Sequence, residues 1–241
     1  MSVKKLLVLS AAAFAAMGAT AAMAGGPDHM AMPSEPAFQN SVYVDGHLGY
    51  TQSDWTNFNS NVVMGTSGNS LFAPIKRGRG GFTGGADIGY TITQHIAVEG
   101  GWFYIPRVKG AVTAFGTADL VPAGSIAKIS SWFAYMAARL TVPLMNDFDL
   151  FGKVGVAYRS LTMTVPAGLA VLSGVSNNGH YWAPLFATGL EYNWGAWRLG
   201  AQYTYLPGNS QVNYGNTAFG APNAAPEVNM YTGFLGYSFN V

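Results

Sequence analysis

The chain contains no cysteine, and only 10% of its 241 residues are charged. The absence of cysteine excludes a disulfide framework, thiolate zinc sites, iron–sulfur clusters, a catalytic cysteine and a lipid-modified N-terminal cysteine. An ordinary soluble domain carries about 25% charged residues, so a water-exposed surface of normal polarity is hard to build from this sequence. The 12 basic and 11 acidic residues nearly balance, which argues against a nucleic-acid binder that relies on net positive charge.

Long hydrophobic runs are also missing. After Ala24, no stretch offers 18 apolar residues without a charge, which excludes membrane-spanning helices. Hydrophobic residues nevertheless make up 49% of the chain and aromatic residues 14%, a content that excludes intrinsic disorder. This apolar excess needs an environment other than water, and a bilayer is the first candidate.

The N-terminus predicts export. Residues 1–24 combine the positive pair Lys4 and Lys5, a short apolar segment and an Ala-Met-Ala cleavage site that ends at Ala24, the pattern of a secretory signal peptide. Residues 25–40 hold three prolines and no periodicity, which predicts a flexible linker. We therefore expect a signal peptide at 1–24, a linker at 25–40 and one folded domain at 41–241.

Eight segments of that domain alternate apolar with small or polar residues, the period of strands with two different faces. They are 42–50, 82–92, 96–104, 132–144, 148–159, 182–192, 197–205 and 231–241. The connections between them alternate as well. Those at 93–95, 145–147 and 194–195 are short, and those at 53–79, 106–128, 166–178 and 207–226 are long. In an up-and-down antiparallel sheet, all the long connections then lie at one end, as in outer-membrane barrels.

The expected fold is an all-β, eight-stranded antiparallel up-and-down transmembrane barrel with short periplasmic turns and four long extracellular loops. A sheet in lipid must close because every backbone polar group needs a partner within the protein. An eight-stranded barrel is narrow and is filled by side chains. Small inward residues make room for them: Gly49, Gly85, Gly89, Gly101 and Gly155. A water-soluble barrel with an apolar cavity is the rival, but it needs more surface charge than this chain has.

The last segment, Tyr231-Thr-Gly-Phe-Leu-Gly-Tyr-Ser-Phe-Asn-Val241, together with the signal peptide and the eight alternating segments, resembles the OmpA-like and opacity-type outer-membrane β-barrel family. The resemblance implies a location in the outer membrane of a Gram-negative bacterium. It also implies that Tyr237, Phe239 and Val241 present an assembly signal to the barrel assembly machinery. The final residue departs from the usual Phe.

Charged residues fall at those alternating positions of the predicted strands that face the barrel interior. The acids are Asp45, Asp87, Glu99 and Glu191, and the bases are Arg139, Lys153, Arg159 and Arg198. Unpaired charges in a narrow barrel are costly, so these eight are expected to pair as a plug of salt bridges, with an ion pathway as the alternative. His47 is assigned to the same polar network rather than to a metal. A turn at Trp194-Gly195 predicts that Glu191 lies opposite Arg198.

Other candidate chemistry is sparse. Five bases at the outer ends of two strands either form a solvated loop or contact lipopolysaccharide phosphates: Lys76, Arg77, Arg79, Arg107 and Lys109. A lipid hydrolase needs Ser, His and an acid together, but His180, with Ser173 and Ser176 before it, has no acid placed beside it. No catalytic residue, metal site or cofactor is predicted.

The sequence thus favours a non-enzymatic outer-membrane scaffold for surface-exposed loops, acting in adhesion or membrane integrity. Its expected partners are outer-membrane lipid and lipopolysaccharide, the assembly machinery and a host-surface ligand, with no nucleic acid. A narrow passive pore is the alternative function, and a lipid hydrolase is the third.

Overall fold

The computed structural model describes residues 39–54, 73–74, 79–111, 126–145, 147–164, 178–209, 212 and 225–241. All of them belong to one compact unit, Phe38–Val241, whereas the unit Met1–Ala37 lies outside the described residues. In the part of the chain that is described, no helix is long and apolar enough to cross a membrane.

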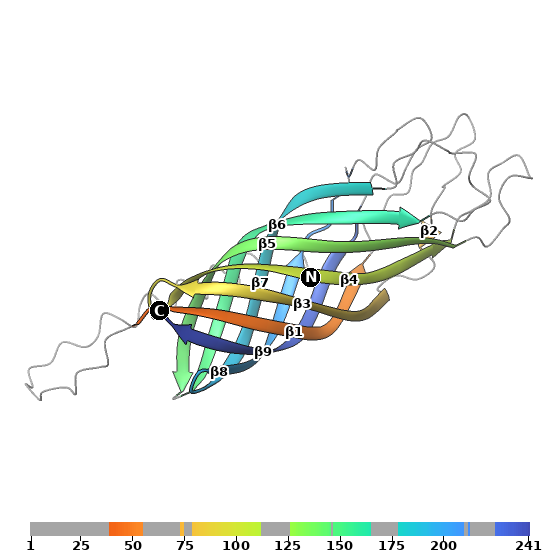
Figure 1. The fold of residues 1–241 in the computed structure, drawn as a ribbon. Helices are drawn as coiled ribbons and strands as arrows, with labels where there is room; N and C mark the ends of the chain where they lie inside the picture. Colours follow the sequence, from red (N-terminus) through yellow and green to blue (C-terminus); the bar gives the residue numbers. More distant parts are fainter. Residues whose placement is uncertain are drawn as a thin grey trace, which may run out of the picture. The chain divides into compact units, whose positions relative to one another are not determined.

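The described residues form a closed antiparallel barrel of eight strands, with β9 hydrogen-bonded to β1 and β4 to β5, as predicted (Figure 1). The neighbour order around the barrel is β1, β3, β4, β5, β6, β7, β8 and β9, and the short β2 pairs only with the end of β4. The bounds are β1 Ser41–Asp54, β2 Ala73–Pro74, β3 Arg79–Thr91, β4 Ile96–Ala111, β5 Ile126–Met145, β6 Phe148–Thr164, β7 Asn178–Trp194, β8 Trp197–Leu206 and β9 Glu227–Asn240.

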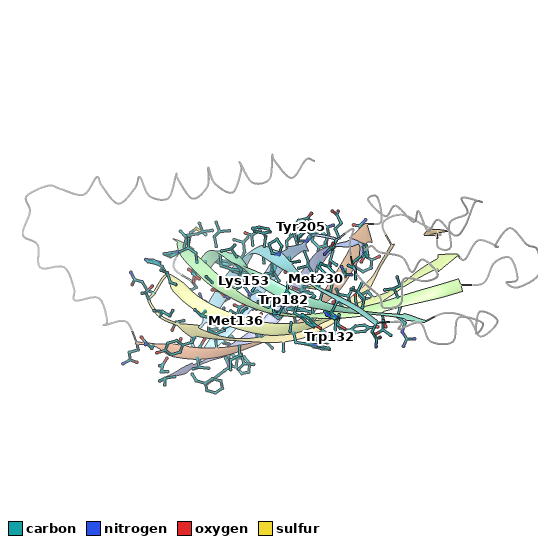
Figure 2. All side chains as sticks on the ribbon, turned by 90° about the horizontal axis from the view of Figure 1, so that it is seen from above. Trp132, Met136, Lys153, Trp182, Tyr205 and Met230 are labelled. Atoms are coloured by element: carbon teal, nitrogen blue, oxygen red, sulfur yellow. The ribbon has the colours of Figure 1, made fainter. Side chains whose placement is uncertain are left out.

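The alternating sequence sorts side chains between the two faces of the sheet. Outward positions are apolar and exposed, such as Leu48 at 78%, Phe82 at 88% and Met136 at 65%. Figure 2 shows side chains covering the outside of the strands, with Trp132, Met136 and Trp182 labelled. Phe148 and Tyr158, both outward, lie ten residues apart on β6. At about 3.3 Å per residue and a tilt of about 40°, they span about 25 Å, the height of the apolar band of an outer-membrane barrel.

Small inward residues make room for large ones in the narrow interior. A Cβ added at Gly89 would lie 2.1 Å from the Tyr43 ring, and one at Gly101 would lie 2.6 Å from the Tyr135 ring. Any larger side chain at these two positions would displace a buried tyrosine.

Several strands are longer than predicted. Strand takes up both ends of the connection expected at 106–128, because β4 continues to Ala111 and β5 begins at Ile126. The β4–β5 register shifts between Ile105 and Val108, where Pro106 has no N–H to donate to the sheet. The proline thus produces a bulge and does not end the strand.

The predicted register of the β7–β8 hairpin is wrong. Trp194 pairs with Trp197, so the turn residues are Gly195 and Ala196, and Glu191 lies opposite Gly200 instead of Arg198. Gly195 has φ +61°, and a positive φ at the first turn position suits the tight turns that match the twist of a hairpin. The shift is two residues, so the inward and outward faces are unchanged.

Candidate functional site: the barrel lumen

The eight charged residues predicted to face inward all lie inside the barrel, and none is more than 6% exposed. Seven of them, with His47, form one connected group that we call the lumen cluster. Its members are Asp45, His47, Asp87, Glu99, Arg139, Lys153, Glu191 and Arg198.

Glu99 on β4 lies between Lys153 and Arg139 in the lumen cluster. Its Oε2 accepts a hydrogen bond from Tyr43 Oη at 2.9 Å, and its Oε1 accepts one from Tyr135 Oη at 2.5 Å. Lys153 Nζ also donates to Oε1, and Arg139 Nη1 lies 3.7 Å from Oε2. Three hydrogen-bond donors and the Arg139 cation, from three other strands, therefore compensate this fully buried carboxylate, as a buried charge requires.

Glu191 on β7 joins two arginines of the cluster. Arg139 Nη2 lies 2.5 Å from Glu191 Oε1, and Arg198 Nη2 lies 2.7 Å from Oε2. Aromatic rings cover both guanidinium groups, since Arg139 lies 4.1 Å from the Phe151 ring centre and Arg198 lies 3.9 Å from that of Tyr43. Ring faces attract cations and also exclude water, which strengthens both pairs.

Asp87 on β3 connects His47 to the rest of the cluster. Its Oδ2 lies 2.9 Å from His47 Nε2, accepts a hydrogen bond from Tyr135 at 2.9 Å and lies 3.5 Å from Lys153 Nζ. His47 Nδ1 lies 3.3 Å from Thr232 Oγ1. Both ring nitrogens of His47 thus have a partner.

The predicted match of four acids with four bases is wrong, because Arg159 lies outside the lumen cluster. Its Nη1 donates to Tyr181 Oη at 3.0 Å and to the Pro226 carbonyl at 2.5 Å, and its Nη2 donates to Ser131 Oγ at 3.3 Å. Within the described ranges, no carboxylate pairs with it. Its partners tie β5, β6 and β7 to the residue just before β9, so Arg159 holds the outer end of the barrel together.

Apart from Arg159 and its partners, the outer half of the lumen is largely apolar, which the sequence analysis missed. The fully buried side chains there share the inward parity of the charged ones: Phe103, Ile105, Phe133, Leu161, Leu206 and Met230. Parity was the available signal, since Phe103 and Ile105 follow Glu99 at even spacing on β4. The lumen therefore consists of a charged segment toward the short turns and a hydrophobic core toward the long connections.

A cavity of about 160 Å³ opens at the end of the barrel that carries the short turns. Its lining includes Gln94 and His95 from the β3–β4 turn, and Arg139, Glu191 and Arg198 from the lumen cluster. The charged segment can thus be reached from this end.

The predicted lipopolysaccharide contacts are only partly described. Arg107 is an exposed residue of β4. Arg79 begins β3 and Lys109 lies on β4, but both side chains are outside the described part, as are Lys76 and Arg77 altogether. The β4–β5 register places Lys128 opposite Lys109, a further base that the sequence analysis did not include.

The residues of the hydrolase alternative do not form a catalytic group in the described ranges. His180 is exposed on β7 and lies opposite Ser160 without a hydrogen bond between them. No described Asp or Glu pairs with this histidine, and Ser173 and Ser176 lie outside the described residues.

The residues of the expected assembly signal lie at the barrel end with the short turns. Tyr237 and Phe239 face outward from β9 with exposures of 36% and 52%, and the terminal Val241 is 79% exposed. The two rings contact each other with centres 4.9 Å apart.

The sequence model of one family, the OmpA-like transmembrane domain, matches residues 37–240. Among solved structures, the outer membrane protein OprG from Pseudomonas aeruginosa is 16% identical, with 84% of this chain and 97% of that chain covered and a TM-score of 0.50. Neisserial surface protein A is 12% identical, with coverages of 82% and 97% and a TM-score of 0.49. Ail of Yersinia pestis, solved with the heparin analogue sucrose octasulfate, is 11% identical, with coverages of 84% and 100% and a TM-score of 0.44. No curated protein sequence matches this chain.

Proposed function

The chain belongs to the OmpA-like transmembrane domain family, and from that premise we propose that this outer-membrane barrel is a non-enzymatic scaffold whose long connections bind partners at the cell surface. The observation that supports this most directly is the filling of the lumen. Phe103, Phe133 and Leu161 are 0% exposed above the lumen cluster, so the described barrel offers no continuous water path. Function then depends on the outer connections.

The proposed partners are anionic groups outside the membrane. Arg107 is exposed on β4, and the backbone places Lys109 and Lys128 directly opposite each other farther along the same hairpin. Arginine and lysine near the outer interface suit lipopolysaccharide phosphates, with arginine able to bind them through two parallel hydrogen bonds. A host-surface ligand bound by the loops is the second partner in this proposal.

The route to the membrane is part of the proposal. Residues 1–24 direct export from the cytoplasm of a Gram-negative bacterium and are removed after Ala24, and residues 25–40 form a linker before the barrel. Tyr237, Phe239 and Val241 then present the C-terminal strand to the barrel assembly machinery. The outward position of Tyr237 and Phe239 on β9 supports this role.

A narrow pore is the second candidate function. The cavity at the short-turn end favours it, because that cavity reaches Arg139 and Glu191 of the lumen cluster. Conduction would require the apolar outer half of the lumen to open. A lipid hydrolase ranks third, since nothing in the described ranges activates His180.

The proposed function can be tested with four variants, each with one of the long outer connections replaced by a short turn. Purified barrels are added to lipopolysaccharide vesicles and to host cells, and a variant with substitutions at Thr93 and Gln94 in a short turn is the matched control. We expect at least one loop variant to lose binding while the control and the SDS-resistant fold are retained. Binding as strong as that of the wild type in all four loop variants, or no binding by the wild type itself, would contradict the proposal.

A further inference from the structure

The lumen cluster lacks one positive charge. It holds four carboxylates, Asp45, Asp87, Glu99 and Glu191, but its permanent cations are only Arg139, Lys153 and Arg198. Burial makes such an imbalance unfavourable, because charges out of water must be paired or neutralised.

The imbalance is concentrated at Asp45 and Asp87, which lie directly opposite each other on β1 and β3. Arg198 Nη2 is 3.5 Å from Asp45 but 2.7 Å from Glu191. Lys153 Nζ is likewise 3.5 Å from Asp87 and closer to Glu99. Each aspartate therefore shares a cation that is bound more closely by a glutamate.

Three carboxylate oxygens at this place have no hydrogen-bond donor. They are both oxygens of Asp45, which is 0% exposed, and Oδ1 of Asp87, which is 3% exposed. Buried side-chain oxygens normally have a partner. Gly236 leaves room for the Asp45 carboxylate, since a Cβ there would lie 1.8 Å from Asp45 Oδ1.

His47 completes the arrangement. One ligand atom from each of Asp45, His47 and Asp87 can be chosen so that all three atoms lie within 4.8 Å of one another. Asp45 and His47 are two residues apart on β1 and share its inward face. Thr232, next to His47 Nδ1, orients the imidazole as an outer-shell partner does at metal sites.

We propose that Asp45, His47 and Asp87 bind a divalent transition-metal ion of the zinc type inside the barrel. A divalent ion that carries one hydroxide adds a single net positive charge, which balances the cluster, and the ion coordinates the unpartnered aspartate oxygens. Imidazole together with carboxylate suits Zn²⁺ and its neighbours, whereas Ca²⁺ and Mg²⁺ prefer oxygen ligands alone. Three protein ligands leave a fourth position for water or hydroxide. The site departs from the sequence analysis, which assigned His47 to the polar network only.

The experiment uses untagged protein without residues 1–24, refolded in detergent with and without Zn²⁺ or Co²⁺ and then freed of loose metal by gel filtration. Refolding in the presence of metal matters because the site is buried. We expect one ion per chain by elemental analysis, a visible Co²⁺ absorption typical of low coordination number, and a higher thermal unfolding temperature in the metal-loaded protein. Ligand binding to the native state alone raises that temperature.

The decisive variants are His47→Gln and Asp45→Asn, with His29→Gln, His95→Gln and His180→Gln as matched controls that cover the other three of the four histidines. We expect at least a tenfold loss of metal affinity and loss of the Co²⁺ absorption in the first two only. The shift between unheated and boiled samples in an SDS gel verifies that each variant is folded, and the near-isosteric Asp45→Asn keeps the test valid if His47→Gln does not fold. Retention of the ion by folded Asp45→Asn, loss of the ion in a control variant, or no bound ion in the wild type would overturn the proposal.

Discussion

Arg198 and Glu191 form a buried ion pair across the β7–β8 hairpin although they do not lie opposite each other. The distance from Nη2 to Oε2 is 2.7 Å, while the residue opposite Glu191 is Gly200. Arg198 reaches Glu191 diagonally, because the residue opposite Arg198 is Asn193, two positions farther along β7. The same guanidinium also reaches Asp45, and the same carboxylate also reaches Arg139.

This arrangement predicts that the stability lost by reversing the charge of one partner is not recovered by also reversing the charge of the other. Arg198→Glu places a carboxylate beside Asp45 and Glu191, and a broken buried pair costs about 3–5 kcal/mol of the free energy of unfolding. Adding Glu191→Arg places a second guanidinium beside Arg139, so we expect little recovery. Urea unfolding of the refolded barrels measures the free energy of unfolding of the wild type and of both variants.

The control for the charge reversal is Arg107→Glu, an exposed position at which we expect a change within about 0.5 kcal/mol. Full recovery of stability in the double variant would mean that Asp45 and Arg139 do not interact with this pair.

The C-terminal strand gives a second prediction. Replacing Tyr237 and Phe239 by Ser is expected to leave export intact and to prevent accumulation in the outer membrane, because both rings lie on the outward face at the end of β9. The measurement is fractionation followed by an SDS gel of unheated samples. Tyr231→Ser, an outward tyrosine at the other end of the same strand, is the control and should insert normally. Normal surface accumulation of the double variant would show that the signal lies elsewhere.

The two-part lumen predicts that the wild-type barrel does not conduct ions steadily. An ion would have to cross the lumen cluster and then a hydrophobic core in which Phe103, Phe133 and Leu161 are fully buried. Recording in planar bilayers, with a general porin as positive control, should show no long-lived ohmic steps. Steady channels from the purified wild type would favour the pore function over the surface scaffold.

The contacts of Arg159 predict a local role at the outer end. Arg159→Met removes the donors to Pro226 and Tyr181, so we expect the nearby backbone pair to open more often. Hydrogen exchange is the measurement, at the amides of Asn209 and Ala225, which donate to each other's carbonyls at 3.1 and 2.7 Å. We expect exchange at least tenfold faster there and unchanged at the Ser238 amide, which donates to the Ala196 carbonyl at the opposite end. Equal acceleration at both ends would indicate global destabilisation instead.

The candidate site was only partly predictable. Parity correctly placed Glu191 and Arg198 on the inner face, because a strand alternates its side chains whatever its neighbours are. It could not show that Arg159 lies apart from the other charges, since that depends on the register between neighbouring strands. Asp45 and Asp87 illustrate the same limit. They lie 42 positions apart in the chain, and only the β1–β3 register brings them face to face.

The sequence by itself determined the barrel, the number of its strands and the face on which each side chain lies, because these follow from local alternation and from the need to satisfy every backbone polar group in lipid. Only the tertiary structure decided which inward residues meet. The hairpin at Gly195 differs by two residues from the expected register without exchanging the faces, so periodicity alone cannot detect the difference. Register and closure placed His47 between Asp45 and Asp87, and they separated the charged lower lumen from the hydrophobic core above it.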